Sequence, residues 1–185
     1  GHSKSPVMHN PVFKRAGLPC VYGARDLPEP AQAERFLAER DFLSINITTP
    51  YKPAALAAAD VQAASARLAH GANVLANKGG TLVAYNTDGQ GCVASLEREG
   101  VTFKGASVVV CGTGPTSLSI LHAVAQAGPA EVVLVGRSVE RSHEVLRTYV
   151  DELGEMVGRI VDMPALREHH LSFAEVYRQV NFRYG

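Results

Sequence analysis

Two short stretches of the sequence place ionisable side chains at the ends of apolar runs. Residues 44–52 read Ser-Ile-Asn-Ile-Thr-Thr-Pro-Tyr-Lys, and residues 85–89 read Tyr-Asn-Thr-Asp-Gly. A lysine and an aspartate at the ends of neighbouring strands can form a buried pair that passes a proton to and from a substrate oxygen. We therefore predict that Lys52 and Asp88 are catalytic. The alternative is that these polar residues form only a turn with a solvated charge.

The alternation within residues 42–48 predicts the strand that positions Lys52. By the period of two, one face of this strand carries two isoleucines that a core could cover. The other face carries Ser44, Asn46 and Thr48. Pro50 cannot continue a sheet ladder, so it ends the strand and leaves Lys52 on a short, stiff arm.

The rest of the first half alternates between helical and strand patterns, which indicates an α/β layer. Ser5 is the expected N-cap of the first helix, with Pro6 as its first residue. Residues 72–76 and 81–85 flank a glycine-rich turn and predict a hairpin. The other expected elements are a short strand at 21–24, a helix at 30–40, an alanine-rich helix at 54–69 interrupted near Asp60, and a helix from Asp88 to Glu99 that ends at Gly100.

Residues 107–135 have the pattern of a dinucleotide-binding βαβ unit: an apolar strand, a glycine-rich turn, a helix and a second apolar strand. Gly112 and Gly114 occupy the first two positions of the glycine fingerprint, whereas Ser117 stands at the third. The amides of such a turn and the positive end of the helix can hold a pyrophosphate. The predicted contacts are Gly112, Thr113, Gly114, Pro115 and Thr116. A tight turn without a ligand is the alternative.

The end of the second strand of this unit indicates which dinucleotide binds. An NAD site has an acidic residue there for the ribose hydroxyls, but residues 136–138 read Gly-Arg-Ser. Arg137, Ser138 and Arg141 instead offer charge and hydroxyl groups to a 2′-phosphate, so we predict NADP. A solvated arginine at the start of the next helix is the alternative.

Composition narrows the partners. The chain has 185 residues, 46% of them hydrophobic, and 18 basic residues balance 18 acidic ones. This balance provides no positive field for nucleic acid or an anionic membrane. Because no apolar run is long enough to span a bilayer and no signal-peptide pattern is present, the expected location is the cytoplasm. We also expect a small-molecule substrate and a monomer or homodimer. The cysteines number three and lack metal-type spacing, so no metal is expected.

Taken in order, several motifs resemble the shikimate dehydrogenase family. They are residues 2–10, Asn46 to Lys52, Asn73, Asn86 to Asp88, Gly112 to Gly114 and Gly136 to Ser138. The resemblance implies NADPH-dependent reduction of 3-dehydroshikimate to shikimate, a step towards aromatic amino acids by the chorismate pathway. It implies that Lys52 and Asp88 transfer the proton, that Ser3 and Ser5 bind the substrate carboxylate, and that Asn46, Thr48 and Asn73 hold its ring hydroxyls.

The same resemblance implies an organisation in two parts. We expect a substrate-binding catalytic domain at 1–87, a connecting helix at 88–100 and a partial Rossmann-like dinucleotide-binding domain at 101–160. A helix at 164–180 could return to the substrate domain. After Gly154 the pattern weakens, and we expect no further strand of the second domain there. Pro115 departs from the family, which usually has another glycine at this position.

Two other functions fit the same architecture. One is a quinate/shikimate dehydrogenase that uses NAD, although Arg137 without an acidic neighbour argues against that cofactor. The other is a non-catalytic sensor of a shikimate-pathway ligand. Retention of both Lys52 and Asp88 argues against a sensor, because a sensor does not need a proton-transfer pair.

Overall fold

The chain folds into α/β structure in two compact units, residues 1–39 and 40–185. The computed structural model describes residues 3–136, 138, 142, 144–145 and 160–162. The predicted fold class, α/β with a Rossmann-like part, is confirmed. Each unit is considered separately below.

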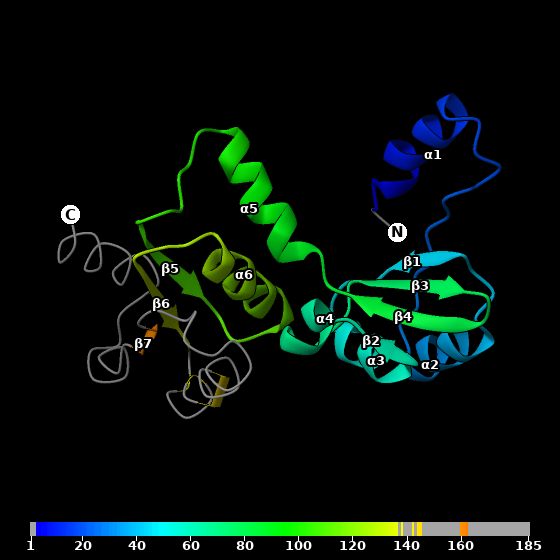
Figure 1. The fold of residues 1–185 in the computed structure, drawn as a ribbon. Coiled ribbons are helices and arrows are strands. Elements are labelled where there is room, and N and C mark those ends of the chain that lie inside the picture. The colour runs from blue at the N-terminus through cyan, green and yellow to red at the C-terminus, as the bar shows by residue number, and fades with distance from the viewer. Residues whose placement is uncertain (1–2, 137, 139–141, 143, 146–159, 163–185) are drawn as a thin grey trace. The chain divides into compact units, whose positions relative to one another are not determined.

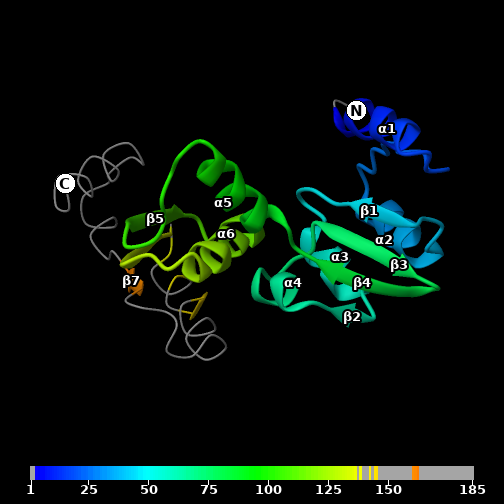
Figure 2. The same ribbon diagram turned by 45° about the horizontal axis from the view of Figure 1, so that its top comes forward.

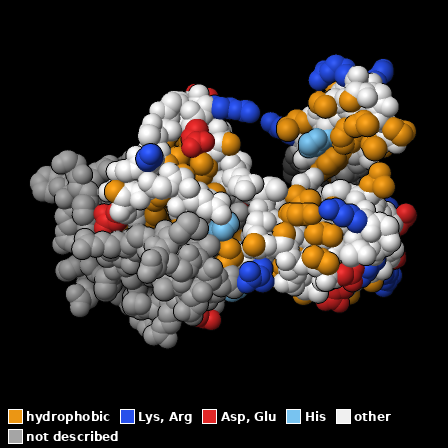
Figure 3. All heavy atoms as spheres, in the orientation of Figure 1, with side chains coloured by type: hydrophobic (Ala, Val, Ile, Leu, Met, Phe, Trp, Pro, Cys, Tyr) orange, Lys and Arg blue, Asp and Glu red, His pale blue; other side chains and the backbone are white. Residues whose placement is uncertain are grey.

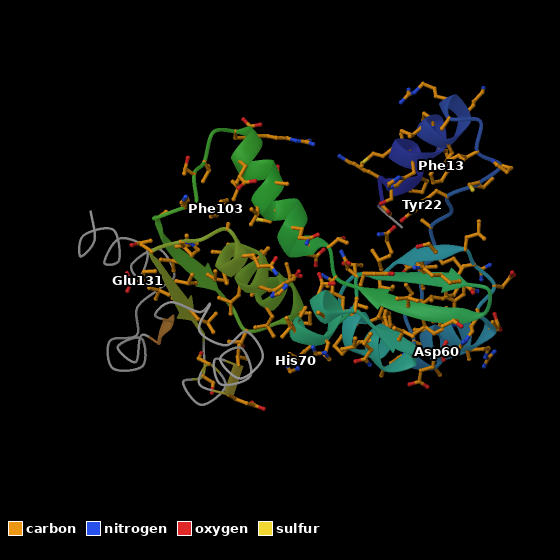
Figure 4. All side chains as sticks on the ribbon, in the orientation of Figure 1. Phe13, Tyr22, Asp60, His70, Phe103 and Glu131 are labelled. Carbon is orange, nitrogen blue, oxygen red and sulfur yellow. The ribbon has the colours of Figure 1, made fainter. Side chains whose placement is uncertain are left out.

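The first unit contains helices α1 (Ser5–Arg15) and α2 (Pro30–Glu39). Between them, the Asn10 side chain accepts a hydrogen bond from Tyr22 N at 2.7 Å and donates one to Tyr22 O at 3.0 Å. The His9 ring stacks on Tyr22, with ring centroids 4.7 Å apart, and Figure 4 labels Tyr22 together with Phe13. The strand expected at residues 21–24 was wrong: a side chain, rather than a neighbouring strand, satisfies the backbone of Tyr22.

The expected N-cap of α1 was also wrong. Lys4 already has helical dihedrals, φ −86° and ψ −6°, and is the residue that precedes the helix. Ser5 is therefore the first helical residue, and its N–H lies 3.4 Å from Ser3 Oγ. Ser3, not Ser5, directs its hydroxyl at the N-terminus of the helix.

The second unit begins with a mixed sheet of order β1-β3-β4-β2. Its strands are β1 (Ser44–Asn46), β2 (Val61–Gln62), β3 (Val74–Lys78) and β4 (Thr81–Tyr85). β3 and β4 form the predicted antiparallel hairpin, which Figure 1 shows as two adjacent arrows of opposite direction. Gly79 and Gly80 make its turn with φ of 62° and 93°, a left-handed conformation that favours glycine at both positions.

The alanine-rich segment is interrupted near Asp60, as expected. It forms helix α3 (Lys52–Ala58), strand β2 and helix α4 (Ala64–Leu68). β2 runs parallel to β4, and Asp60 N and Ala63 N donate to Leu82 O and Ala84 O beside it. Both helices contact β4 (Figure 2). The strand expected at 42–48 is shorter than predicted, because only residues 44–46 pair with β3.

The remaining described elements are α5 (Asp88–Arg98), β5 (Ser107–Cys111), α6 (Pro115–Gln126), β6 (Glu131–Val135) and β7 (Ile160–Asp162). Of these, β5, α6 and β6 form the predicted βαβ unit. The three strands β5, β6 and β7 are parallel, in the order β5-β6-β7. The expectation of no further strand after Gly154 was wrong, since β7 pairs with β6. The helix expected at 164–180 lies outside the described residues.

One hydrophobic core of this unit surrounds α6 and includes residues at the end of α4. Leu118 and Leu121 of α6 are fully buried, and α6 packs against α5 and β5. Phe103, labelled in Figure 4, belongs to the same core. Leu68 and Ala69, at the end of α4, complete it. Because α4 also contacts β4, residues of the first sheet are held close to α6.

The described surface agrees with the composition. On the face shown in Figure 3, acidic and basic side chains form separate small groups rather than a continuous patch of one sign. Among the described residues, no helix combines the length and apolar character needed to cross a bilayer. The same residues contain no cluster of side chains able to hold a metal ion.

Candidate active site

Lys52 and Asp88 lie together, although 36 positions separate them in the sequence. Each is the first residue of a helix, Lys52 of α3 and Asp88 of α5. Lys52 Nζ lies 2.5 Å from Asp88 Oδ2, and the two side chains are 10% and 24% exposed. Placement in the first turn of α5 also favours the Asp88 carboxylate, because the N-terminus of a helix attracts negative charge. The result is a largely buried ion pair with access to solvent on the carboxylate side.

Backbone and side-chain bonds hold both ends of the pair. Lys52 O accepts Ala72 N–H at 2.9 Å, which fixes the start of α3 to the segment before β3. Asn86 is 2% exposed, and its Nδ2 donates to Gly71 O at 2.8 Å. Its Oδ1 accepts Asp88 N–H at 3.2 Å. Asn86 therefore links Gly71 to the start of α5. The only sequence signal for this role was its position in the Asn-Thr-Asp motif.

Asn73 contacts the carboxylate directly. Its Nδ2 donates to Asp88 Oδ1 at 2.6 Å and lies 3.1 Å from Thr87 Oγ1. Its Oδ1 accepts Thr87 N–H at 2.9 Å. The sequence pointed to Asn73 as a substrate contact; in the structure this amide also orients Asp88.

Asn46 and Thr48 lie near the same corner by backbone pairing. Asn46 is opposite Val74 in the sheet, and Ile47 N–H donates to Asn73 O at 2.8 Å. Both predicted residues are exposed. The end of β1 therefore runs beside Asn73, and it carries the polar residues Asn46 and Thr48.

A further side chain of the site comes from α6. Lys52 Nζ donates to Thr116 Oγ1 at 2.7 Å, and Thr116 Oγ1 donates to Asp88 Oδ2 at 3.2 Å. Sequence reasoning placed Thr116 in the glycine-rich turn as a cofactor contact. It did not foresee that the same hydroxyl closes a triangle with Lys52 and Asp88.

The glycine-rich turn lies between β5 and α6. Gly112 has φ of 107°, and its N–H donates to Val135 O at 2.7 Å, so the turn stays close to the end of β6. Ser117, which replaces the third glycine of the fingerprint, donates its hydroxyl to Cys111 O at 3.0 Å. The amides of Thr116 and Ser117 lie in the first turn of α6, where a helix offers no partner.

The residues after β6 are described only in part. Ser138 O accepts both the N–H and the hydroxyl of Ser142, at 3.1 and 2.9 Å. A Cβ at Gly136 would overlap Ser142 Oγ, so Gly136, directly after β6, is closely packed against Ser142. Arg137 and Arg141 lie outside the described residues. Ser3 and Ser5 belong to the first unit, and their predicted contact with a carboxylate stays a prediction.

The Lys52–Asp88 pair at the starts of α3 and α5, next to the glycine-rich turn of a βαβ unit, defines an α/β protein with a Rossmann-like part. Residues 1–75 match the shikimate dehydrogenase substrate binding domain. The chain is therefore similar to the shikimate dehydrogenase family.

Individual relatives agree with this assignment. The shikimate dehydrogenase (NADP(+)) of Symbiobacterium thermophilum is 36% identical over 183 residues, covering 97% of this chain and 62% of the relative. The shikimate 5-dehydrogenase of Thermus thermophilus, solved with NADP(H) and shikimate, superposes with a TM-score of 0.73 at 30% identity, covering 90% of this chain and 61% of that one. A 5-ketofructose reductase of Gluconobacter sp. strain CHM43 superposes with a TM-score of 0.70 at 27% identity, covering 86% and 57%. The chain thus spans about three fifths of the length of these proteins.

Proposed function

We propose that this chain carries the proton-transfer pair and the first part of the NADP site of a shikimate dehydrogenase. The reaction would be the reversible reduction of 3-dehydroshikimate to shikimate, as part of aromatic amino-acid biosynthesis. The observation that carries the proposal is the Lys52–Asp88 pair, 2.5 Å apart and largely buried, beside the glycine-rich turn. The names of the relatives supply the substrate and the cofactor.

In this proposal the lysine moves the proton. Bound NADPH would supply the hydride for the carbonyl carbon. An ammonium has three protons, and those of Lys52 include one directed at Asp88 and one at Thr116. The remaining proton would be donated to the carbonyl oxygen of the substrate, while Asp88 stabilises the charge of Lys52 and Asn73 fixes the orientation of Asp88.

The substrate would be held by the polar groups around the pair. Asn46, Thr48 and Asn73 would bind the ring hydroxyls, because amide and hydroxyl groups both donate and accept hydrogen bonds. Ser3 and Ser5 would bind the carboxylate. A site built this way discriminates strongly against analogues that lack a hydroxyl.

The turn from Gly112 to Thr116 would hold the pyrophosphate of the cofactor, with Arg137, Ser138 and Arg141 at the 2′-phosphate. Pro115 has no amide proton, so the amides of Thr116 and Ser117 are the available donors in the first turn of α6. The domain boundaries at 87 and 100, a cytoplasmic location and a monomeric or homodimeric state belong to the same proposal.

A second candidate substrate is another hydroxylated ketone. The Gluconobacter neighbour is named a 5-ketofructose reductase and shares the fold at 27% identity. Quinate with NAD is a further variant of the same chemistry. All of these would use the same pair, so the substrate test separates them.

The full-length protein should be assayed by absorbance of the reduced cofactor with shikimate, quinate and 5-ketofructose, each with NADP and NAD in the redox state that the direction requires. We expect shikimate with NADP⁺ to give the highest kcat/KM. A preference for 5-ketofructose would assign the second candidate. Binding of shikimate without turnover in any pairing would indicate a sensor and contradict the proposal.

A further inference from the structure

The hydroxyl of Thr116 belongs to two structures at once. It lies in the first turn of α6, directly after the glycine-rich turn, and it bonds both members of the Lys52–Asp88 pair. No side-chain bond caps α6, so this hydroxyl does not serve the helix terminus. Its partners, at 2.7 and 3.2 Å, are the ammonium and the carboxylate.

Close packing sets the position of Thr116. A Cβ at Gly71 would lie 2.9 Å from Pro115 Cβ and 3.1 Å from Lys52 Cβ. Pro115 and Lys52 therefore both pack closely against Gly71, where a larger residue would not fit. A Cβ at Gly89 would lie 1.9 Å from Ser119 O, and Gly89 N–H donates to Ser119 Oγ at 2.9 Å. The N-terminal part of α6 therefore packs closely against Gly71 and Gly89 through Pro115 and Ser119, and Thr116 lies between these two residues in the sequence.

The bonding capacity of each group fits this triangle. A threonine hydroxyl has one proton and two acceptor positions. Here it accepts from the lysine and donates to the carboxylate, so both ends of the ion pair gain a partner from the same atom. Valine has the same shape as threonine without the hydroxyl, and serine keeps the hydroxyl without the methyl group.

We propose that Thr116 is a positioning residue that holds Lys52 and Asp88 in the arrangement needed for proton transfer and ties this arrangement to the dinucleotide turn. The inference rests on the function proposed above for the reaction itself. The contact between Thr116 and the pair has its own test, which does not depend on that function.

The first experiment measures steady-state kinetics of the full-length protein with shikimate and NADP⁺. Thr116→Val should lower kcat about tenfold, roughly the effect of one hydrogen bond to a charged group, with KM for both substrates changed less than about twofold. Thr116→Ser should recover most of the rate. Thr102→Val, the same replacement at an exposed threonine after α5, is the matched control and should match the wild type.

The second experiment follows the lysine without requiring turnover. Limited acetylation, with each lysine quantified by mass spectrometry, should modify Lys52 several times faster in Thr116→Val than in the wild type, because one bond to its ammonium is lost. Lys104, which is exposed, serves as the internal reference. Thr116→Ser should label like the wild type.

The outcomes separate the two proposals. Wild-type kcat in Thr116→Val, a rise confined to KM for NADP⁺, or a Thr116→Ser enzyme as slow as Thr116→Val would overturn the positioning role. Unchanged labelling of Lys52 would overturn the contact. If Lys52 is acetylated as expected in the wild type and in the variants, but the wild type does not oxidise shikimate, the proposed function is contradicted and the contact of Thr116 with the pair is still supported.

Discussion

The structure describes one arginine–aspartate ion pair and one lysine–aspartate ion pair, which have similar N–O distances but differ in exposure to solvent. Arg40 and Asp60 lie 2.6 Å apart with side chains 35% and 40% exposed, whereas Lys52 and Asp88 are 10% and 24% exposed. Exposed pairs contribute little and are screened by salt, while a largely buried pair keeps a strong local field. Exposure therefore separates a pair suited to chemistry from one that only links loops.

Replacing Lys52 tests the catalytic half of this contrast. Lys52→Ala should lower kcat by about two to four orders of magnitude, because a general acid is lost. Affinity for shikimate, measured by titration, should stay within a few-fold, since Asn46, Thr48 and Asn73 remain. An equal loss of affinity and turnover would make Lys52 a binding residue instead.

The exposed pair predicts a dependence of stability on pH. Hydrogen bonds from Arg40 and from Leu82 N–H lower the pKa of Asp60 below its ordinary value of 3.8. A carboxyl with a lowered folded-state pKa contributes stability above its unfolded pKa, and that contribution is lost as the pH falls through the folded value. Asp60→Asn should thus be less stable than the wild type at pH 7, and the difference should shrink as the pH falls through the lowered pKa of Asp60.

The measurement for Asp60 is the urea midpoint of the full-length protein across a series of pH values. Asp26→Asn, at an exposed aspartate of the first unit, is the control and should show no such convergence. A deficit of Asp60→Asn that persists unchanged in acid would mean that shape, and not charge, sets the contribution of Asp60.

At the scale of elements, the contact between α5 and α6 places the carboxylate. Gly89 follows Asp88 in the first turn of α5 and meets the backbone of Ser119 in α6. Gly91, two residues further along the same helix, has open space around it. The two glycines lie in the same helix, but only Gly89 is closely packed, so the same substitution at both positions tests the packing.

Gly89→Ala should destabilise the protein by about 2 kcal/mol or more, since the new methyl group overlaps backbone atoms. Gly91→Ala should be neutral or stabilise it by about 0.5–1 kcal/mol, because alanine favours a helix. Urea unfolding of both variants gives the comparison. Similar midpoints for the two would show that α5 shifts to relieve the overlap.

At the scale of the molecule, the second unit holds both the Lys52–Asp88 pair and the glycine-rich turn, with a core shared through Leu68 and Ala69 of α4. This arrangement brings the Lys52–Asp88 pair next to the proposed cofactor site. The chain spans 62% of the first relative.

The predicted preference for NADP over NAD can be tested at Arg137. Arg137→Ala should raise KM for NADP⁺ about tenfold or more and change KM for NAD⁺ less than about twofold, since only NADP⁺ has the 2′-phosphate. Arg98→Ala, at the exposed end of α5, is the control for a lost positive charge. An equal effect of Arg137→Ala on both cofactors would contradict the 2′-phosphate contact.

The sequence by itself determined the α/β class, the β3–β4 hairpin, the βαβ unit and the candidate pair. Each of these leaves a local signal: period-two alternation, a glycine-rich turn, or a polar residue at the end of an apolar run. Short segments carry less of this signal. β7 has three residues and was missed, and residues 21–24 begin with Val and Tyr, which favour strands, but do not form one.

Only the tertiary structure decided which side chains meet. Thr116 lies 64 positions from Lys52, and Ser119 lies 30 positions from Gly89. Contacts of this kind depend on the packing of α6 against α5 and α4, and local periodicity does not encode that packing. The sequence therefore supplied the reactive groups, while long-range packing set their distances, their burial and the threonine that joins them.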